Sequence, residues 1–318
     1  VSSSPRGDLA TRAVRGSALS IAGSIITWGL GALRLVLLTR YLLPADVGVA
    51  AQALIFVTLA VRLQTMGLHQ AYIQHSDPDE RVLRTFFTLR LGLLLGVLLL
   101  LVLVTPWLLR AYPSMPLLGP VLMGYIGVEL LALFPTVQVT ILTRRLAFRR
   151  LVLADIAASV AMTIVAPAMA ILGFGVWALV GEALSAILAR GAVTWTWWPR
   201  LGWDRGAARH FWRYGKALWS SSSLTHLLDN FDDFWVGLTL GRDPLGLYAR
   251  AYEFARYPRR VVAAPLLDIF LPIYARLQDD PLRLSRAFFR ASSLMVRSGF
   301  LFGLLFIANH HTRIHISA

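Results

Sequence analysis

The chain has 318 residues, of which 57% are hydrophobic and only 15% charged, whereas soluble globular chains average about 45–50% apolar and about 25% charged residues. This composition excludes a soluble enzyme and predicts a protein that has the lipid bilayer as its solvent. The net charge of +14 would indicate a nucleic-acid partner in a soluble protein, but the arginines recur here in short groups between apolar runs, so we expect none.

Nine apolar runs, separated by charged or Pro/Gly-containing breaks, predict nine membrane-spanning helices of about 20 residues or more. The first run is too long for a cleavable signal peptide, and no small-residue cleavage site follows it. The predicted fold class is therefore all-α, a polytopic transmembrane helix bundle with about nine spans. The expected spans are residues 17–39, 46–68, 86–109, 117–143, 151–173, 175–197, 217–241, 246–272 and 291–308.

Basic residues are divided unevenly between the two sides of the predicted bundle. Counted over alternate loops, 18 lie on the side of the N-terminus, whereas Arg40, Arg110 and Arg242 lie on the other side. Arginine and lysine collect in cytoplasmic loops, so we expect a multi-pass protein of the bacterial cytoplasmic membrane with its N-terminus in the cytoplasm. Tryptophans near the end of the sixth span are expected to anchor it at the membrane interface: Trp195, Trp197, Trp198 and Trp203.

Two weak sequence repeats have nearly the same offset. Residues 16–19 match residues 215–218 at an offset of 199, and residues 44–51 align with residues 243–249 at an offset near 198. Both pairs fall at equivalent points of the predicted topology, which indicates a six-span unit used twice in one orientation. The expected domains are a cytoplasmic N-terminal segment (1–16), a complete six-helix lobe (17–197), a cytoplasmic inter-lobe loop (198–216), the first three helices of a second lobe (217–308) and an aberrant or truncated tail (309–318).

Charged side chains inside the predicted spans are candidate functional groups, because each costs a few kcal/mol to insert into a bilayer. Arg34 lies in the first span and Arg62 in the second. Four more charges lie in spans four to six: Glu129, Asp155, Glu182 and Arg190. For all of these, pairing with one another is as good an interpretation as a functional role.

Spans seven and eight carry a denser set of charges. Asp229, Asp232 and Asp233 have the i, i+3, i+4 spacing that places them on one helical face. The eighth span contributes a mixed set: Arg250, Glu253, Arg256 and Arg260. Two interpretations stay open, a salt-bridge network between the two spans, or a polar cavity in which the arginines hold an anionic ligand and the carboxylates couple to a cation or proton.

Several kinds of chemistry have no matching motif in the sequence. There is no phosphate-binding loop, no long soluble domain and no Asp-rich metal motif, and the lack of cysteine removes thiolate catalysis and cysteine-based metal sites. We therefore expect no catalytic residue, no metal site and no cofactor, and a protein that is not an enzyme.

Three motifs in order carry a family resemblance. They are the turn Tyr41–Gly48 after the first span, the segment Leu172–Val180 between spans five and six, and Leu240–Tyr248, which is followed by Tyr257-Pro258 and Phe270–Asp280. At this spacing the chain resembles, over about residues 14–308, the polysaccharide/oligosaccharide flippase family of the multidrug/oligosaccharidyl-lipid/polysaccharide exporter superfamily.

The resemblance implies a flippase that carries undecaprenyl-diphosphate-linked oligosaccharide across the membrane during exopolysaccharide, capsule or O-antigen assembly. It implies two lobes around an Arg-lined cavity, alternating access and coupling to an ion gradient. The implied partners are the lipid-linked oligosaccharide, membrane lipid and other polysaccharide-assembly proteins. By this resemblance, Arg34, Arg62, Arg250, Arg256 and Arg260 would bind the anionic head group, and Asp229, Asp232, Asp233 and Glu253 would serve ion coupling or a salt-bridge network.

Three alternatives remain at this point. An ion-coupled exporter of drugs or organic cations from the same superfamily should have an acidic or aromatic cavity. A membrane glycan polymerase or ligase needs large outside loops, whereas the outside loops predicted here have about ten residues or fewer. The third alternative is an inactive truncated product.

Overall fold

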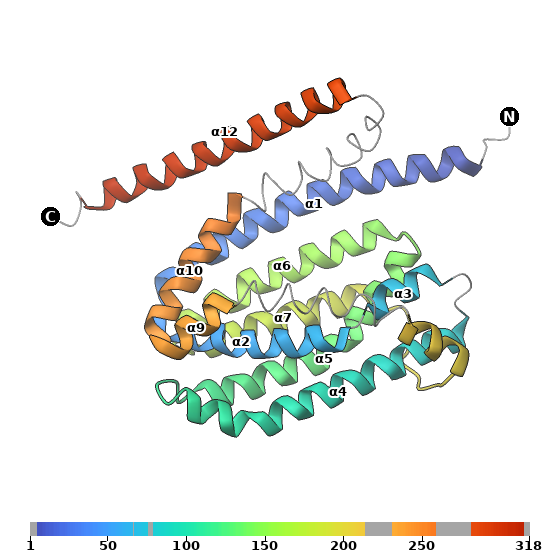
Figure 1. The fold of residues 1–318 in the computed structure, drawn as a ribbon, viewed down its shortest axis with the longest axis horizontal. Helices are drawn as coiled ribbons and strands as arrows, with labels where there is room; N and C mark the ends of the chain where they lie inside the picture. Colours follow the sequence, from blue (N-terminus) through green and yellow to red (C-terminus); the bar gives the residue numbers. More distant parts are fainter. Residues whose placement is uncertain (1–4, 66, 76–78, 214–230, 259–280, 315–318) are drawn as a thin grey trace. The chain divides into compact units, whose positions relative to one another are not determined.

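The structure is a computed structural model that describes residues 5–65, 67–75, 79–213, 231–258 and 281–314 (Figure 1). No strand occurs among these residues, which confirms the all-α fold class. The labelled helices are α1 (Pro5–Tyr41), α2 (Pro44–Thr65), α3 (Leu68–Gln74), α4 (Glu80–Ala111), α5 (Leu118–Arg144), α6 (Phe148–Ile171), α7 (Trp177–Thr194), α9 (Phe231–Thr239), α10 (Arg242–Pro258) and α12 (Pro281–Ile314).

Six of these helices are long and apolar enough to cross a membrane, and each coincides with one of the first six predicted spans. They cover Ala22–Tyr41, Pro44–Arg62, Glu80–Ala111, Leu118–Arg144, Phe148–Ile171 and Trp177–Thr194. The described parts of the seventh and eighth predicted spans are α9 and α10, and the ninth lies within α12. The number of spans beyond six stays a prediction.

The ends of the helices follow local backbone chemistry. The side chain of Asp79 caps α4 by accepting a hydrogen bond from the Val82 amide at 2.9 Å. Between α6 and α7, Gly173 and Gly175 have φ angles of +83° and +54°, a region that glycine enters without steric cost. This turn is part of the Leu172–Val180 motif, so the motif marks a tight connection between two adjacent spans.

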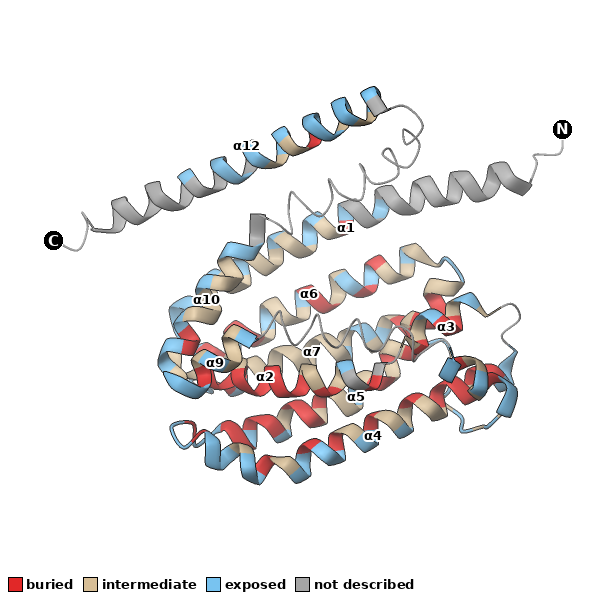
Figure 2. Ribbon diagram, in the orientation of Figure 1, coloured by how far each residue is buried: buried red, intermediate tan, exposed pale blue. Residues whose placement is uncertain are grey.

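The buried side of the bundle is formed mainly by α2, α4 and α5. In Figure 2 the buried residues run along these helices, and they include Phe86, Leu94, Leu118 and Leu122. Long apolar side chains on the outer sides stay exposed, for example Leu99 and Ile164. Such a surface is what a helix needs toward lipid tails, because hydrocarbon solvates leucine as well as protein does.

The described chain divides into two compact units, residues 1–249 and residues 250–318. The first unit holds the six apolar helices, α3, α9 and the start of α10. The second holds the rest of α10 and α12. The lobe bounds expected from the sequence repeat, 17–197 and 217–308, stay a prediction, as do the bounds 1–16, 198–216 and 309–318.

Residues 195–213, which follow α7 and are called the strap below, are held against the first unit by a buried glutamine of α5. The Gln138 side-chain amide donates to the Trp197 carbonyl at 2.6 Å, and its oxygen accepts from the Thr196 amide, the Thr196 hydroxyl and the Trp197 amide at 2.9–3.0 Å. Gln138 is fully buried. Every hydrogen-bonding group of the side chain except one N–H is therefore engaged with the strap.

We expect Gln138→Leu to loosen the strap and to lower the free energy of unfolding by about 1–3 kcal/mol, because it leaves partly buried backbone groups at Thr196 and Trp197 without this partner. Limited proteolysis within residues 195–213 and thermal unfolding in detergent measure the two effects. Gln64→Leu is the matched control, since Gln64 is also buried but its side-chain oxygen accepts no hydrogen bond within the described residues. Equal effects of the two substitutions would contradict the conclusion that the Gln138 hydrogen bonds hold the strap.

Candidate intramembrane polar sites

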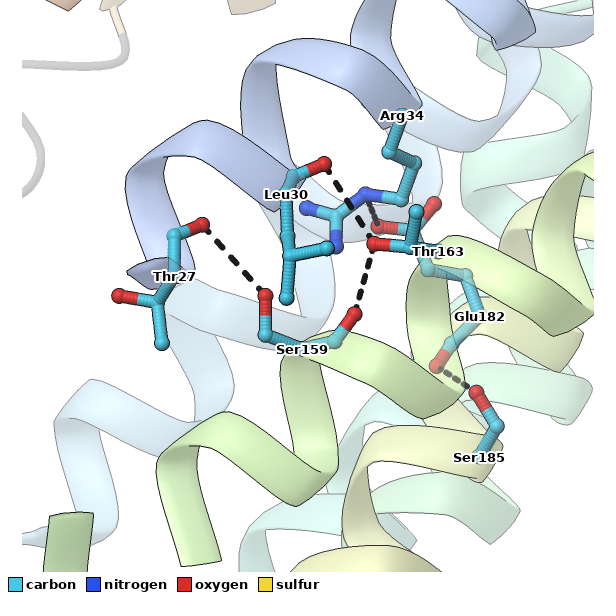
Figure 3. A network of polar contacts seen from close by, with 7 residues as sticks. All are labelled: Thr27, Leu30, Arg34, Ser159, Thr163, Glu182 and Ser185. Carbon is cyan, nitrogen blue, oxygen red and sulfur yellow. Dashed lines mark hydrogen bonds and ion pairs between the residues drawn. The ribbon is translucent and has the colours of Figure 1, made fainter. Parts of the chain in front are cut away.

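Arg34, the first candidate residue, lies in an ion pair inside the predicted membrane. Its Nε atom on α1 is 3.0 Å from Oε1 of Glu182 on α7, and the two side chains are only 19% and 15% exposed (Figure 3). A charge in hydrocarbon is stabilised when it is paired. The structure therefore gives Arg34 a partner, as the pairing interpretation expected.

Hydroxyl groups on α6 reinforce the contact with α1 beside this ion pair. The Ser159 hydroxyl donates to the Thr27 carbonyl, and the Thr163 hydroxyl lies at the same distance, 3.4 Å, from the Leu30 carbonyl (Figure 3). Polar contacts of this kind join helices in a bilayer, where apolar packing gives no advantage over lipid. Arg34 therefore lies in a small polar network rather than alone among apolar side chains.

A second ion pair joins α6 to α7. The Arg190 guanidinium is 2.7 Å from Oδ1 of Asp155, and these side chains are 45% and 56% exposed. Two of the charges noted in spans four to six thus pair with each other at a more exposed position. The two ion pairs together fix α7 against both α1 and α6.

Arg62 is not part of the Arg34 network. It lies in the last turn of α2 and is exposed. At 1.5 Å per residue, Arg62 is about 27 Å from the start of α2, whereas Arg34 is about 10 Å from the adjoining end of α1. The structure therefore places these two predicted ligands of one head group at different depths.

Asp232 and Asp233 occupy the first turn of α9. The Tyr248 hydroxyl on α10 donates a hydrogen bond to Oδ2 of Asp232, which closes α9 and α10 into a hairpin. Asp233 also has an interaction partner. Asp229, the third carboxylate of the predicted face, lies outside the described residues.

The basic candidates of α10 belong to the second unit. The guanidinium carbon of Arg256 lies 5.1 Å from the centre of the Tyr252 ring, a cation–π distance. Arg250 and Glu253 also have interaction partners, and Arg260 lies outside the described residues. The expected link between these arginines and the aspartates of α9 stays a prediction.

One buried charge was missed in the sequence. Arg90 on α4 is buried, its Nε atom has no hydrogen-bond partner within the described residues, and it interacts electrostatically with Glu129 on α5. Nearby on α3, His69 bonds to the Thr140 hydroxyl at 2.8 Å, and burial, followed by the Arg90 charge, lowers the pKa of His69. An arginine within the apolar run 86–109 was the available signal.

A close backbone contact between α2 and α10 was also missed. A Cβ atom on Gly48 would lie 1.8 Å from the Arg242 carbonyl oxygen, and one on Gly246 would lie 1.8 Å from the Pro44 carbonyl oxygen. Gly246 follows Gly48 by 198 residues, and Arg242 follows Pro44 by the same interval. The two halves of the second sequence repeat therefore meet each other. Gly48 contacts the Arg242 carbonyl and Gly246 contacts the Pro44 carbonyl, so the two contacts are equivalent under the repeat.

The same face of α2 continues this contact. Gln52, one turn after Gly48, packs on Gly237 of α9, and the ring of Phe56, a further turn along, is 6.4 Å from that of Phe234. One stripe of α2 thus meets the α9–α10 hairpin.

Among the described residues, no group of three or more His, Asp or Glu side chains could hold a metal ion.

The described residues include six apolar helices long enough to cross a membrane, and ion pairs and hydroxyl contacts join α1, α6 and α7. These features define a multi-pass helical membrane protein. The family described as "Polysaccharide biosynthesis protein" matches residues 37–315. The chain belongs to this family, which confirms the resemblance seen in the sequence.

Three relatives show how far the similarity extends. The chain is 24% identical over 308 residues to the succinoglycan biosynthesis transport protein ExoT of Rhizobium meliloti (strain 1021), covering 94% of this chain and 60% of ExoT. It is 25% identical over 317 residues to the lipopolysaccharide biosynthesis protein WzxC of Escherichia coli (strain K12), covering 95% and 63%. The teichuronic acid biosynthesis protein TuaB of Bacillus subtilis (strain 168) is 24% identical over 275 residues, covering 77% and 52%.

The chain therefore spans about three fifths of the length of the first of these relatives. No solved structure matches the chain. The names of these relatives refer to the biosynthesis of succinoglycan, lipopolysaccharide and teichuronic acid, and the name of ExoT also says transport.

Proposed function

We propose that this chain acts in moving a lipid-linked oligosaccharide across the bacterial cytoplasmic membrane, as a transporter rather than an enzyme. The observation that carries the proposal is the family match over residues 37–315, on a chain whose described residues include six helices apolar enough to cross a membrane. ExoT is by name a transport protein of succinoglycan biosynthesis. An undecaprenyl-diphosphate carrier is the substrate class that we propose, with the N-terminus of the chain in the cytoplasm.

The physical problem is the diphosphate head group, which cannot enter hydrocarbon without paired charge. Arginine suits this task because its guanidinium stays ionised when dry and binds phosphate bidentately. In our proposal Arg34 exchanges Glu182 for a substrate phosphate, so that the ion pair holds the guanidinium in place between transport events. Arg62, which lies at a different depth from Arg34, and Arg250, Arg256 and Arg260 are the other candidates for contact with the head group during its passage.

The carboxylates are proposed to serve ion coupling. Asp232, which accepts a hydrogen bond from the Tyr248 hydroxyl, is the first candidate. Asp229, Asp233 and Glu253 are the other candidates. Protonation of a carboxylate removes its negative charge and would weaken the hydrogen bond that it accepts, and in our proposal this links a proton or cation gradient to movement of the α9–α10 hairpin. With Asp232→Asn we expect transport that no longer depends on an imposed proton or sodium gradient; unchanged gradient dependence would remove Asp232 from this role.

The proposal is tested by alanine substitutions of Arg34, Arg62 and Arg256 at the native gene locus. We expect surface polysaccharide to fall for each variant while lipid-linked precursor accumulates in the inner leaflet. The fall should be at least about tenfold for Arg34→Ala, whose ion pair with Glu182 is mostly buried, since truncating one partner of such a pair costs about 2–5 kcal/mol. Immunoblots measure the amount of each variant in the membrane, and lipid extraction measures the lipid-linked precursor. Arg190→Ala is the control, since Arg190 sits in the more exposed ion pair.

Three outcomes separate the possibilities. Normal polysaccharide in all three variants would overturn the cationic site. Loss in the variants together with loss of inserted protein would assign Arg34 a structural role only. Normal precursor flipping with lost efflux of organic cations would favour the drug-exporter alternative.

A further inference from the structure

The strap ends in a short helix that is fixed to the first unit. The Gly202 amide donates to the Thr88 hydroxyl at 3.0 Å, and the Asp204 amide donates to the Thr85 hydroxyl at 2.8 Å. The side chain of Asp204 then accepts from the Ala207 amide at 2.7 Å, which caps the helix over residues 205–213. Figure 1 shows this gold helix beside the beginning of α4.

The two faces of this helix differ sharply. Ala207 and Phe211 are buried, and the Phe211 ring lies 6.0 Å from that of Phe86 on α4. Arg205, Arg209 and Arg213 follow one another at intervals of four, so they share the opposite face, and all three are exposed. None of them pairs with a carboxylate in the part of the chain that the structure describes.

Large apolar side chains lie exposed on the strap around these arginines. Trp198 is 73% exposed, and Trp203 and Trp212 are 62% and 63% exposed. Leu201, between Trp198 and Trp203, is also exposed. Tryptophan with arginine is the composition of segments that lie in the membrane–water interface, where the ring enters the acyl boundary and the cation remains among the head groups.

The hydrogen bonds to Thr85 and Thr88 on α4 place the strap at the depth of the membrane–water interface. Helix α4 has 32 residues, or about 48 Å at 1.5 Å per residue, whereas the hydrocarbon core is about 30 Å thick. Thr85 and Thr88 lie about 8–12 Å from the start of α4. The strap is therefore tied to the part of α4 where the chain leaves the hydrocarbon and meets the head groups.

We propose that the exposed face of the strap is a docking surface for anionic phospholipid head groups, with Arg205, Arg209 and Arg213 on the phosphates and the tryptophans in the acyl boundary. Three guanidinium groups on one helical face, none of them paired with a carboxylate among the described residues, are complementary to a negatively charged lipid surface. A phospholipid surface fits better than a single substrate molecule, because the arginines face away from the buried side that packs on α4. On the predicted orientation this is the cytoplasmic leaflet.

The experiment uses the purified chain in a neutral detergent, with titration of phosphatidylglycerol or phosphatidylcholine and thermal unfolding as the readout. We expect the unmodified chain to be stabilised by phosphatidylglycerol at far lower concentration than by phosphatidylcholine, with an advantage that shrinks as salt is raised. The triple variant Arg205→Gln/Arg209→Gln/Arg213→Gln should lose at least about tenfold in apparent affinity for phosphatidylglycerol, since each arginine near a lipid surface is worth about 1 kcal/mol, or about fivefold.

The matched control removes three other arginines: Arg283→Gln/Arg286→Gln/Arg290→Gln. These lie on α12 and are exposed, so the change in net charge is equal. A loss of phosphatidylglycerol affinity in the strap variant alone supports the proposal. Equal losses in both variants would reduce the effect to net charge and overturn it, as would unchanged affinity in the strap variant. Because the readout is lipid binding, failure here leaves the proposed transport function untouched.

Discussion

Alanine in place of Gly48 or Gly246 should abolish the close packing of α2 on α10 and should lower the free energy of unfolding by about 3 kcal/mol or more. A Cβ atom on either residue would lie 1.8 Å from a carbonyl oxygen of the other helix. Backbone cannot rotate away as a flexible side chain can, so the helices would have to separate. The face of α2 beyond Gly48, with Gln52 and Phe56, would lose its contacts with α9 at the same time.

Thermal unfolding in detergent and the yield of folded protein measure this effect. The controls are Gly92→Ala and Gly96→Ala on α4, where a Cβ atom would meet nothing within 4 Å. These two should leave stability unchanged or raise it by about 0.5–1 kcal/mol, because alanine loses less entropy than glycine in a helix. If Gly48→Ala and Gly246→Ala behave like the controls, α2 and α10 do not approach as described.

Replacing Glu182 alone should lower the free energy of unfolding more than replacing Glu182 and Arg34 together. Breaking a buried ion pair leaves one charge uncompensated and costs about 3–5 kcal/mol, whereas replacement of both partners by apolar residues is often close to neutral. We expect Glu182→Leu to lower stability by that amount and Arg34→Met/Glu182→Leu to restore most of it. Unfolding of the four members of this double-mutant cycle gives the coupling free energy.

The same cycle separates structure from function. The stable double variant should still lose most of its transport, because it lacks the Arg34 guanidinium that we propose to bind the substrate phosphate. Normal polysaccharide export by the double variant would restrict Arg34 to a structural role. In the parallel cycle on Asp155 and Arg190, whose side chains are about half exposed, the coupling should be about 1 kcal/mol or less, and a value as large as that for Arg34 and Glu182 would contradict the difference in burial.

The six apolar spans could be predicted because a long run of apolar residues is a local property of the sequence. Their ends were less accessible to prediction. The third span was expected to begin at residue 86, but α4 begins at Glu80, because Asp79 caps a polar first turn that hydropathy ignores. The sixth was expected to reach residue 197, but α7 ends at Thr194, where the Arg150 guanidinium donates hydrogen bonds to the carbonyls of Val193 and Trp195.

Partners across the bundle could not be predicted from the sequence. The alternation of spans does not say which helices touch, so Arg34 and Glu182, which lie on the first and sixth spans, could be marked as charges but not joined. Arg90 was missed because a single arginine hardly lowers the hydropathy of its run. The contact of Gly48 with α10 was hidden for a similar reason, since a repeat shows that two segments are equivalent but not that they meet.

That contact has the form of an interface in a two-fold symmetric homodimer, where one patch contacts its own copy and every interaction occurs twice. Here both copies of the patch lie on one chain, 198 residues apart. A substitution at either position alone breaks the symmetry, and a compensating change must come from the other copy. The two segments are therefore expected to evolve as a pair, constrained by each other rather than by their separate neighbours.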